Sequence, residues 1–257
     1  MRGSLIGMCI GVVALGAWSN ALRADEVPIP NGNFAADDAS TQLEYSYPSP
    51  LTDWQCSSPG GNTSVGVFFN SPSFPNPSPP PASSPNPLFI TNLNSTQAAY
   101  LYNNPGTQMY QLLPSTYQAG QSYHLQFGLI ASDATVPYVG AIPSGAPIEL
   151  QLYYLDSSSN MVTVGSDIVA NIGTDIVNQT FFDMLELDVP TVPAAAIGRQ
   201  IGIQIIVPAN EPAAQQGGVW DVGNLDLTTA VPEPASLAIL GCGLAIVALR
   251  RRRGAGV

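Results

Sequence analysis

The chain has no lysine, a single histidine (His124) and three cysteines in 257 residues. Its seven basic residues are all arginines, and six of them lie before residue 25 or after residue 230. Residues 25–230 therefore hold one arginine, Arg199, against seventeen acids, a formal charge of −16. This composition excludes nucleic acid, whose binding depends on phosphate neutralisation by Lys and Arg. It also argues against anionic membranes and polymers as direct electrostatic partners, and leaves divalent cations and neutral glycans compatible.

The scarcity of cysteine excludes an internal disulfide. Cys9 and Cys242 fall in apolar stretches near the two chain ends, which leaves Cys56 alone between them. Stability must then come from an ordinary hydrophobic core, and about 200 residues are enough for one domain to build it. A catalytic Cys56 would need a histidine partner, so a buried structural cysteine is the interpretation we favour.

Catalytic motifs are absent as well. The sequence has no Gly-x-Ser-x-Gly, no His-Glu-x-x-His and no phosphate-binding glycine loop. His124 alternates with Tyr123 and Leu125, which is typical of a surface or edge histidine on a strand. Glycoside hydrolysis needs only two carboxylates, but no pair stands out among the seventeen acids. We therefore predict a non-catalytic protein, with a glycoside-acting enzyme as the alternative.

The N-terminal end has the composition of a secretory signal peptide. A basic residue at position 2 precedes an apolar run over residues 5–18, and small residues follow at Ala21 and Ala24. Cleavage after Ala21 and cleavage after Ala24 both fit the pattern. The prediction is a helical signal peptide over residues 1–24.

The C-terminal end has three parts: a Pro-Glu-Pro motif, an uncharged run over residues 235–249 and a basic cluster. Fifteen helical residues span about 22 Å, less than the roughly 30 Å of a bilayer's hydrocarbon core. As a permanent anchor the run is therefore marginal. The basic cluster stays on the cytoplasmic side by the positive-inside rule, which places residues 25–230 outside.

This tail, residues 231–257, resembles a PEP-CTERM sorting signal. The residues that carry the resemblance are Pro232, Glu233, Pro234, Arg250, Arg251, Arg252 and Arg253. The resemblance implies export and processing by an exosortase, a membrane transpeptidase of bacteria that build extracellular polysaccharide. It implies a protein of the outer surface or extracellular matrix, transiently anchored in the inner membrane by its C-terminal transmembrane helix. A plain C-terminal membrane anchor is the alternative.

Between the two ends, alternation of apolar and polar residues predicts strands and no helix. Turn signals such as Ala119-Gly120 and Gln216-Gly217-Gly218 separate the runs. The nine predicted strands are residues 64–69, 98–102, 108–113, 122–130, 148–155, 161–169, 180–189, 200–207 and 219–228. Short strands with such breaks predict an all-β sandwich over residues 25–230.

Residues 72–87 interrupt this pattern, because eight of the sixteen are proline. Such a segment can join neither a helix nor a central strand. A domain boundary there would leave about 47 residues on its N-terminal side, too few for a core without disulfides. We predict an exposed proline-rich loop within one domain.

A second resemblance covers nearly the whole of residues 25–230. In order, the matching segments include Pro28-Ile29-Pro30-Asn31-Gly32-Asn33-Phe34, Asp53-Trp54, Val65-Gly66-Val67-Phe68, Ala98-Ala99-Tyr100-Leu101 and Trp220-Asp221-Val222-Gly223-Asn224-Leu225. The pattern is similar to the galactose-binding-like jelly rolls that form the exported domains of many PEP-CTERM proteins. The resemblance implies a jelly-roll β-sandwich.

In related carbohydrate-binding modules, acids near both ends of this pattern hold a structural calcium ion. Here Ala35 stands where an acid is expected after Phe34, and the usual Asp-Asn-Val reads Asp221-Val222-Gly223-Asn224. Asp37 and Asp38 could approach Asp221 if the first and last strands pair, but calcium needs six to eight oxygens. We favour acids on solvated turns and no cofactor, with a calcium ion at Asp221 as the alternative.

Glycan binding is the more specific of the functional hypotheses, since sugar sites use exposed aromatic and amide side chains and the sequence offers both. The candidates are Tyr45, Tyr47, Tyr102 and Asn103, with Trp54, Tyr138, Trp220, Asn104 and Gln108 as further members. Trp54 and Trp220 fall at recurring family positions, where we expect core packing. The hypothesis is an exported surface or matrix protein that binds exopolysaccharide. The alternative is a structural surface protein, anchored by its tail, with no specific ligand.

Overall fold

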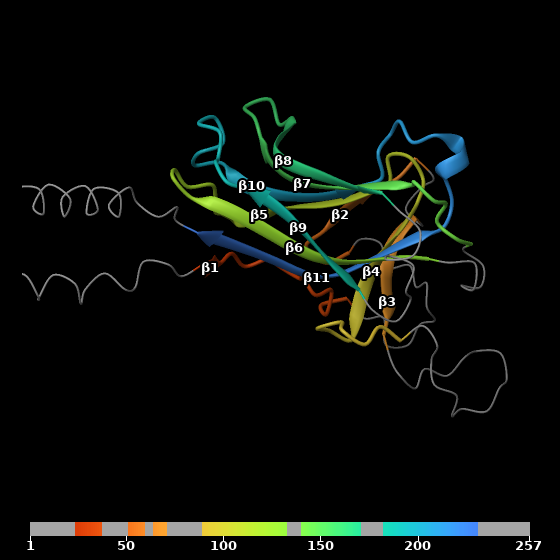
Figure 1. The fold of residues 1–257 in the computed structure, drawn as a ribbon. Helices are drawn as coiled ribbons and strands as arrows, with labels where there is room; N and C mark the ends of the chain where they lie inside the picture. Colours follow the sequence, from red (N-terminus) through yellow and green to blue (C-terminus); the bar gives the residue numbers. More distant parts are fainter. Residues whose placement is uncertain are drawn as a thin grey trace, which may run out of the picture.

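Two antiparallel sheets, one layered on the other, make up the folded part of the chain (Figure 1). The computed structural model describes residues 24–37, 51–59, 64–70, 89–132, 140–170 and 182–230. Sheet A has the order β3-β4-β11-β6-β9, with β1 added beside β11, and sheet B has the order β2-β5-β10-β7-β8. The strands are β1 (Asp25–Glu26), β2 (Gln55–Ser57), β3 (Val65–Phe69), β4 (Gln97–Tyr102), β5 (Gln108–Thr116), β6 (Ser122–Ala131), β7 (Pro147–Leu155), β8 (Met161–Ala170), β9 (Asp183–Val189), β10 (Gln200–Ile206) and β11 (Val219–Ala230).

The predicted sandwich is confirmed as an all-β, two-sheet antiparallel fold, and each of the nine predicted strands is present. β5 runs on to Thr116, beyond the predicted end at Leu113. Pro114 is tolerated because β2 pairs only with residues 108–110, and the ladder with β10 is irregular between Gln200 and Gly202. The strands β1 and β2 were not predicted, since two or three residues carry no periodicity.

The main core lies between the sheets and consists of the inward-facing residues of both. In β6, Tyr123, Leu125 and Phe127 point inward, whereas His124 alternates to the outside, as predicted. Trp54 and Trp220 are both buried in this core, which confirms the expectation for them. Burial of large apolar side chains, at roughly 25 cal/mol per Å² of apolar surface, is the main stabilising contribution.

A smaller apolar cluster covers part of the outward face of sheet A. Phe182 and Ile90 pack there on Tyr100 of β4 and Ile130 of β6. Two asparagines hold the covering segments: Asn70 exchanges two hydrogen bonds with the backbone of Ile90 (2.8 and 2.9 Å). Asn92 does the same with Phe182 (2.7 and 2.9 Å). β4 is therefore buried on both faces.

The chain enters and leaves the sandwich at the same end of sheet A. Asp25 lies opposite Thr229, so the first strand pairs with the end of the last strand (Figure 1). The predicted signal peptide up to residue 23, the proline-rich loop 72–87 and the tail 231–257 lie outside the described residues. Within the described part, no helix is long and apolar enough to cross a membrane.

Candidate functional site

The outward face of sheet B carries a row of uncharged polar side chains that crosses all five strands. The register places Gln55 of β2 beside Tyr110 of β5, and Tyr110 beside Gln204 of β10. Gln204 lies beside Gln151 of β7, and Gln151 beside Ser166 of β8. We call these five residues the neutral row. Alternation along each strand turns the row away from the core.

Hydrogen bonds join the neutral row to the adjacent row of the same face. The Gln204 amide donates to Oε1 of Gln108, whose own amide donates to Oγ of Ser57 at 2.7 Å. The Gln151 amide donates to Oε1 of Glu149 at 2.8 Å, and Thr163 donates to Oε1 of Gln151 at 3.1 Å. Each amide nitrogen has two N–H groups, and each of the three amide-donated bonds uses one of them. The glutamines are thereby held in defined orientations.

Tyr153 fixes the centre of this face. Gly202 lies opposite it on β10, and a Cβ at Gly202 would lie 2.4–2.5 Å from the Tyr153 ring. The missing side chain thus lets the ring lie flat across β10, and its hydroxyl donates to the Gln111 carbonyl at 3.3 Å. Burial raises the pKa of Tyr153, with a smaller contribution from Tyr110, so its hydroxyl stays protonated. Tyr110 itself is half-buried.

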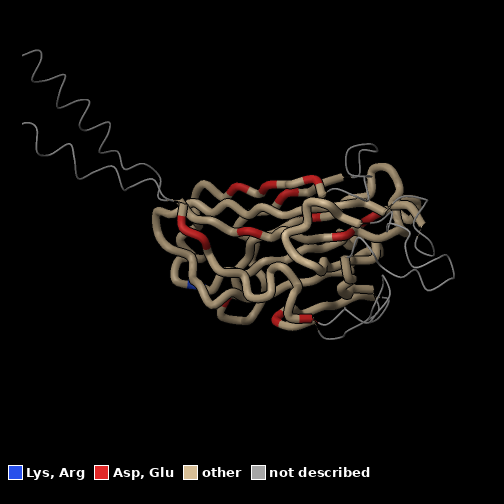
Figure 2. The backbone as a smooth tube through the Cα atoms, turned by 90° about the horizontal axis from the view of Figure 1, so that it is seen from below, with Lys and Arg blue, Asp and Glu red and all other residues tan. Residues whose placement is uncertain are grey.

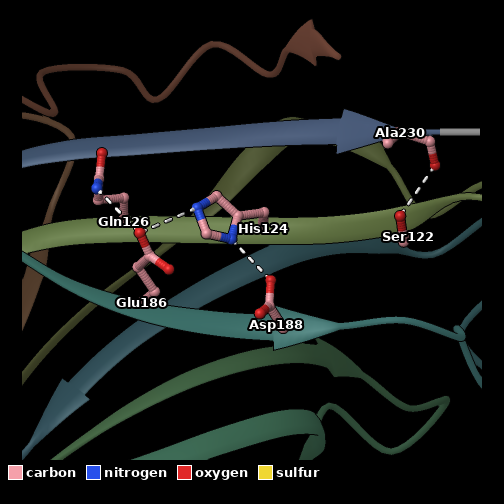
Figure 3. Close-up of polar contacts among 6 residues, drawn as sticks. All are labelled: Ser122, His124, Gln126, Glu186, Asp188 and Ala230. Carbon is pink, nitrogen blue, oxygen red and sulfur yellow. Dashed lines mark hydrogen bonds and ion pairs between the residues drawn. The ribbon is translucent and has the colours of Figure 1, made fainter. Parts of the chain in front are cut away.

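The outward face of sheet A has the opposite chemistry. His124 of β6 lies between two acids of β9, with Nδ1 at 2.7 Å from Asp188 and Nε2 at 4.0 Å from Glu186 (Figure 3). Glu26 of β1 and Asp226 of β11 belong to the same face. Acids are spread over the described backbone, against one basic residue (Figure 2). Sheet A therefore presents an acidic face and sheet B a nearly neutral one.

His124 and its two acidic neighbours do not converge on a common ligand position. Its two ring nitrogens point in opposite directions, so Asp188 and Glu186 do not converge on one point (Figure 3). The nearby hydroxyl of Ser122 donates to the Ala230 carbonyl at 3.1 Å and not to the imidazole. Within the described ranges, no group of three or more His, Cys, Asp or Glu residues could hold a metal ion. His124 is a surface residue, as predicted.

Asn103, a predicted ligand residue, is fully buried at the end of the sandwich opposite to the chain ends. Its Oδ1 accepts from the Trp220 indole N–H at 2.9 Å. Its Nδ2 donates to Oε1 of Glu211 at 3.0 Å and to the Gln215 carbonyl at 2.6 Å. β11 and the segment that leads into it therefore occupy both polar atoms of this side chain. Tyr102 is half-buried nearby, edge-on to Tyr100 at a ring distance of 6.1 Å.

Glu211 is the one buried carboxyl of this cluster. Its Oε1 accepts from Asn103, whereas its Oε2 is buried without a hydrogen-bond partner. Burial raises the pKa of Glu211 above its ordinary value, and the hydrogen bond from Asn103 offsets part of that rise. A half-satisfied buried carboxyl stabilises its protonated form.

Protein donors occupy the carboxylate of Asp37, one of the acids considered for calcium. Asn31 donates to it at 2.7 Å and the Thr52 N–H at 2.8 Å. Asp221 lies on β11 between Tyr100 and Ile130, and Asp38 lies outside the described residues. Calcium at Asp221 stays a prediction. Cys56 is half-buried beside the core, and burial together with Asp37 raises its pKa to about 12, consistent with an unreactive structural thiol.

The neutral row is not among the binding residues predicted from the sequence. Of those predicted residues, only Gln108 lies on this face, in the row beside it, while Tyr45, Tyr47 and Tyr138 lie outside the described residues. Part of the signal was present in the sequence: Gln151 and Gln204 each stand between two apolar residues of a predicted strand, whereas Gln55 lies on β2, which was not predicted. Only the pairing order shows that these positions are neighbours, because strands far apart in sequence meet in sheet B.

Comparison with known proteins identifies one sequence motif and one fold. The fold is an all-β sandwich of two antiparallel sheets. Residues 230–253 match the PEP-CTERM protein-sorting motif, so the chain carries this signal at its C-terminal end. The motif implies processing by an exosortase, and PEP-CTERM proteins are exported and sorted to the cell surface. No curated protein matches the sequence.

Solved structures share the sandwich at low sequence identity. A cyclase from Fischerella sp. TAU, in complex with 4-(1H-indol-3-yl)butan-2-one, is 18% identical with a TM-score of 0.58, over 82% of this chain and 100% of that one. TmCBM61 in complex with β-1,4-galactotriose is 15% identical with a TM-score of 0.40, over 77% and 95%. The CBM22-1 xylan-binding domain of Paenibacillus barcinonensis Xyn10C is 8% identical with a TM-score of 0.37, over 72% and 91%. These similarities concern the fold alone.

Proposed function

We propose that this protein is exported, processed at its tail by an exosortase, and retained outside the cell as a non-catalytic surface or matrix protein that binds neutral glycan. The neutral row is the observation that supports glycan binding. Five uncharged polar side chains cross sheet B in one line, four interstrand spacings long or about 19 Å. That length suits several consecutive sugar rings.

Amides and hydroxyls match the chemistry of a neutral sugar. Each sugar hydroxyl is both donor and acceptor, and one glutamine amide supplies both functions from a single side chain. Because Gln151 is already oriented by hydrogen bonds, its side chain loses little conformational freedom on binding. Gln204, in the middle of the row, is buried (6% exposed) and acts by donating a hydrogen bond to Gln108. Tyr110, half-buried within the row, supplies a ring against which an apolar sugar face can pack.

Charge selects among glycans. The segment 25–230 carries a formal charge of −16, with Arg199 as its one basic residue, so uronate-rich polymers are repelled. On the outward face of sheet B the described rows contain one acid, Glu149. The proposed ligand is therefore an uncharged polysaccharide that crosses the strands along the neutral row.

Gln151→Ala is expected to weaken retention on the producing bacterium's neutral exopolysaccharide about three- to tenfold, since one to two hydrogen bonds are lost. Gln126→Ala is the matched control, because Gln126 is a half-buried glutamine at an outward mid-strand position of sheet A. Affinity electrophoresis of the exported protein measures both variants. Equal weakening by both changes, or wild-type migration no different from that in a polysaccharide-free gel, would contradict glycan binding at this face.

The same experiment separates the alternatives. A structural surface protein with no ligand is favoured by the hydrogen bonds from the neutral row to the adjacent row, in which Gln151 and Gln204 each use one amide N–H without sugar. That alternative predicts no retention. A glycoside-acting enzyme predicts the release of reducing ends during incubation, whereas the proposed function predicts none.

The tail gives a separate prediction. The mass of the protein recovered outside the cell is expected to lack the residues beyond the Pro232-Glu233-Pro234 region. Replacing these three residues by alanine should keep the tail and leave the protein in the membrane fraction. A full-length tail on the wild-type external protein would show that the apolar segment is a simple anchor. The triple variant tests sorting without altering any described residue of the sandwich.

A further inference from the structure

Strand β8 (Met161–Ala170) forms one edge of sheet B. Among the described residues β7 is its only ladder partner, so within that part of the chain no strand pairs with the other side of β8. Long edge strands of this kind are templates for pairing with another chain. β8 also carries two of the exposed large apolar side chains, Ile168 (58% exposed) and Met161 (39%). We propose that two copies of this protein pair through β8, antiparallel, into one continuous sheet.

The sequence of β8 is complementary to itself in this arrangement. With a two-fold axis between Val164 and Gly165, Met161 of one copy lies opposite Ile168 of the other, and Thr163 lies opposite Ser166. The ladder with β7 shifts register between Gly165 and Thr163, so Val164 is an extra residue of β8 and Thr163 and Ser166 come to the same face. All four side chains are therefore outward, opposite the outward residues Leu155, Tyr153, Gln151 and Glu149 of β7. Each exposed apolar side chain therefore meets an apolar side chain of the second copy, and this pair occurs twice.

The distribution of charge favours this edge over the others. Repulsion opposes the association of two copies, because each has seventeen acids within residues 25–230. β8 contains one acid, Asp167, which lies opposite Val162 of the second copy in the proposed register. β9, the edge of sheet A, contains Asp183, Glu186 and Asp188. The remaining edges, β1, β2 and β3, have two, three and five residues and offer short ladders.

Pairing at β8 also extends the proposed binding face. Ser166 ends the neutral row at β8, so the second copy continues the outward face of sheet B beyond it. Two rows on one surface give bivalent attachment to a polymer, which raises overall affinity without new contacts. The dimer itself needs no glycan, so its test is independent of glycan binding.

Light scattering of the exported protein after size exclusion measures the dimer. The expected result is a concentration-dependent dimer that strengthens at higher ionic strength, because salt screens the repulsion between the acidic copies. Ile168→Asp should weaken the dimer at least tenfold without unfolding the exposed strand. Met184→Asp is the control, since Met184 is 38% exposed on β9. A wild-type monomer at every concentration, or a dimer unaffected by Ile168→Asp, would overturn the proposal.

Cysteine pairs test the register directly. Residues opposite each other in an antiparallel pair have Cα atoms about 4.5–5.5 Å apart, within the range that a disulfide spans. The double variant Thr163→Cys/Ser166→Cys should form disulfide-linked dimers under mild oxidation, and each single variant far fewer. Cys56, with its pKa raised to about 12, contributes little thiolate to this reaction. Equal amounts of linked dimer in single and double variants would rule out this pairing.

Discussion

Replacing Asn103 with alanine is expected to lower the free energy of unfolding by about 3–5 kcal/mol, because the change leaves several buried polar groups without a hydrogen-bond partner. The Trp220 indole N–H loses its acceptor at 2.9 Å. Glu211 and the Gln215 carbonyl lose the donor that binds them at 3.0 and 2.6 Å. None of these groups can turn to solvent without moving the segment that leads into β11. Urea unfolding of the exported protein measures the loss.

Asn104→Ala is the matched control for this prediction. Asn104 is adjacent in sequence and half-buried, and the change should alter the free energy of unfolding by no more than about 0.5 kcal/mol. If Asn103 instead acted mainly as a glycan ligand, its replacement would reduce binding and leave stability close to wild type. Similar losses for Asn103→Ala and Asn104→Ala would contradict the structural role.

The pH dependence of the free energy of unfolding is a second test of the contact between Asn103 and Glu211. Glu211 has a folded-state pKa above its ordinary 4.5, so the folded chain holds this proton more tightly than the unfolded chain. The stabilisation that Glu211 adds to the free energy of unfolding is fully present below pH 4.5 and is lost as pH rises through the folded-state pKa. In Asn103→Ala the hydrogen bond that lowers this pKa is gone, so the loss should shift to higher pH. Glu211→Gln should remove this contribution to the pH dependence.

Gly218→Ala is expected to lower the free energy of unfolding by about 2–5 kcal/mol, from backbone strain and overpacking together. Gly218 has a φ of +80°, and a Cβ there would lie 2.5 Å from the backbone nitrogen of Ile142 and 2.7 Å from the carbonyl carbon of Ala141. Both neighbours are backbone atoms, which cannot rotate away. The Gly218 carbonyl also accepts from the N–H of Asn103 at 3.0 Å, so a shift there disturbs the same cluster.

Gly217→Ala separates the two contributions. Gly217 has a φ of +104°, and a Cβ there would meet nothing within 4 Å. Strain alone should then lower the free energy of unfolding by about 1–2 kcal/mol. Thermal and urea unfolding of both variants give the comparison. A loss in Gly217→Ala as large as that in Gly218→Ala would show that the contact with residues 141 and 142 is unimportant.

Much of the fold could be predicted from local pattern. The alternation in residues 122–130 identified β6 together with its inward face, and the same rule found all nine longer strands. β1 could not be found this way, because two exposed residues become a strand only by pairing with Thr228 and Thr229. Pro114 argued for an earlier end of β5, yet the ladder is irregular at that point and tolerates it.

The candidate binding residues could be predicted less well than the strands. The aromatic and amide residues chosen from the sequence include Trp54, Trp220 and Asn103, all of which are buried. Composition identifies residue types that suit a sugar, but a buried asparagine and an exposed one have the same letter. The neutral row instead consists of glutamines, a tyrosine and a serine with no distinctive spacing along the chain.

The sequence by itself determined the sorting tail, the acidic and disulfide-free character of residues 25–230 and the all-β class, because each follows from contiguous residues or from composition. Only the tertiary structure decided which strands are neighbours. That order brings Gln55, Tyr110, Gln204, Gln151 and Ser166 into one line and separates the neutral face from the acidic one. It also places β8 at an open edge. Alternation determines which face a side chain takes, whereas hydrogen bonding between distant strands determines what lies beside it.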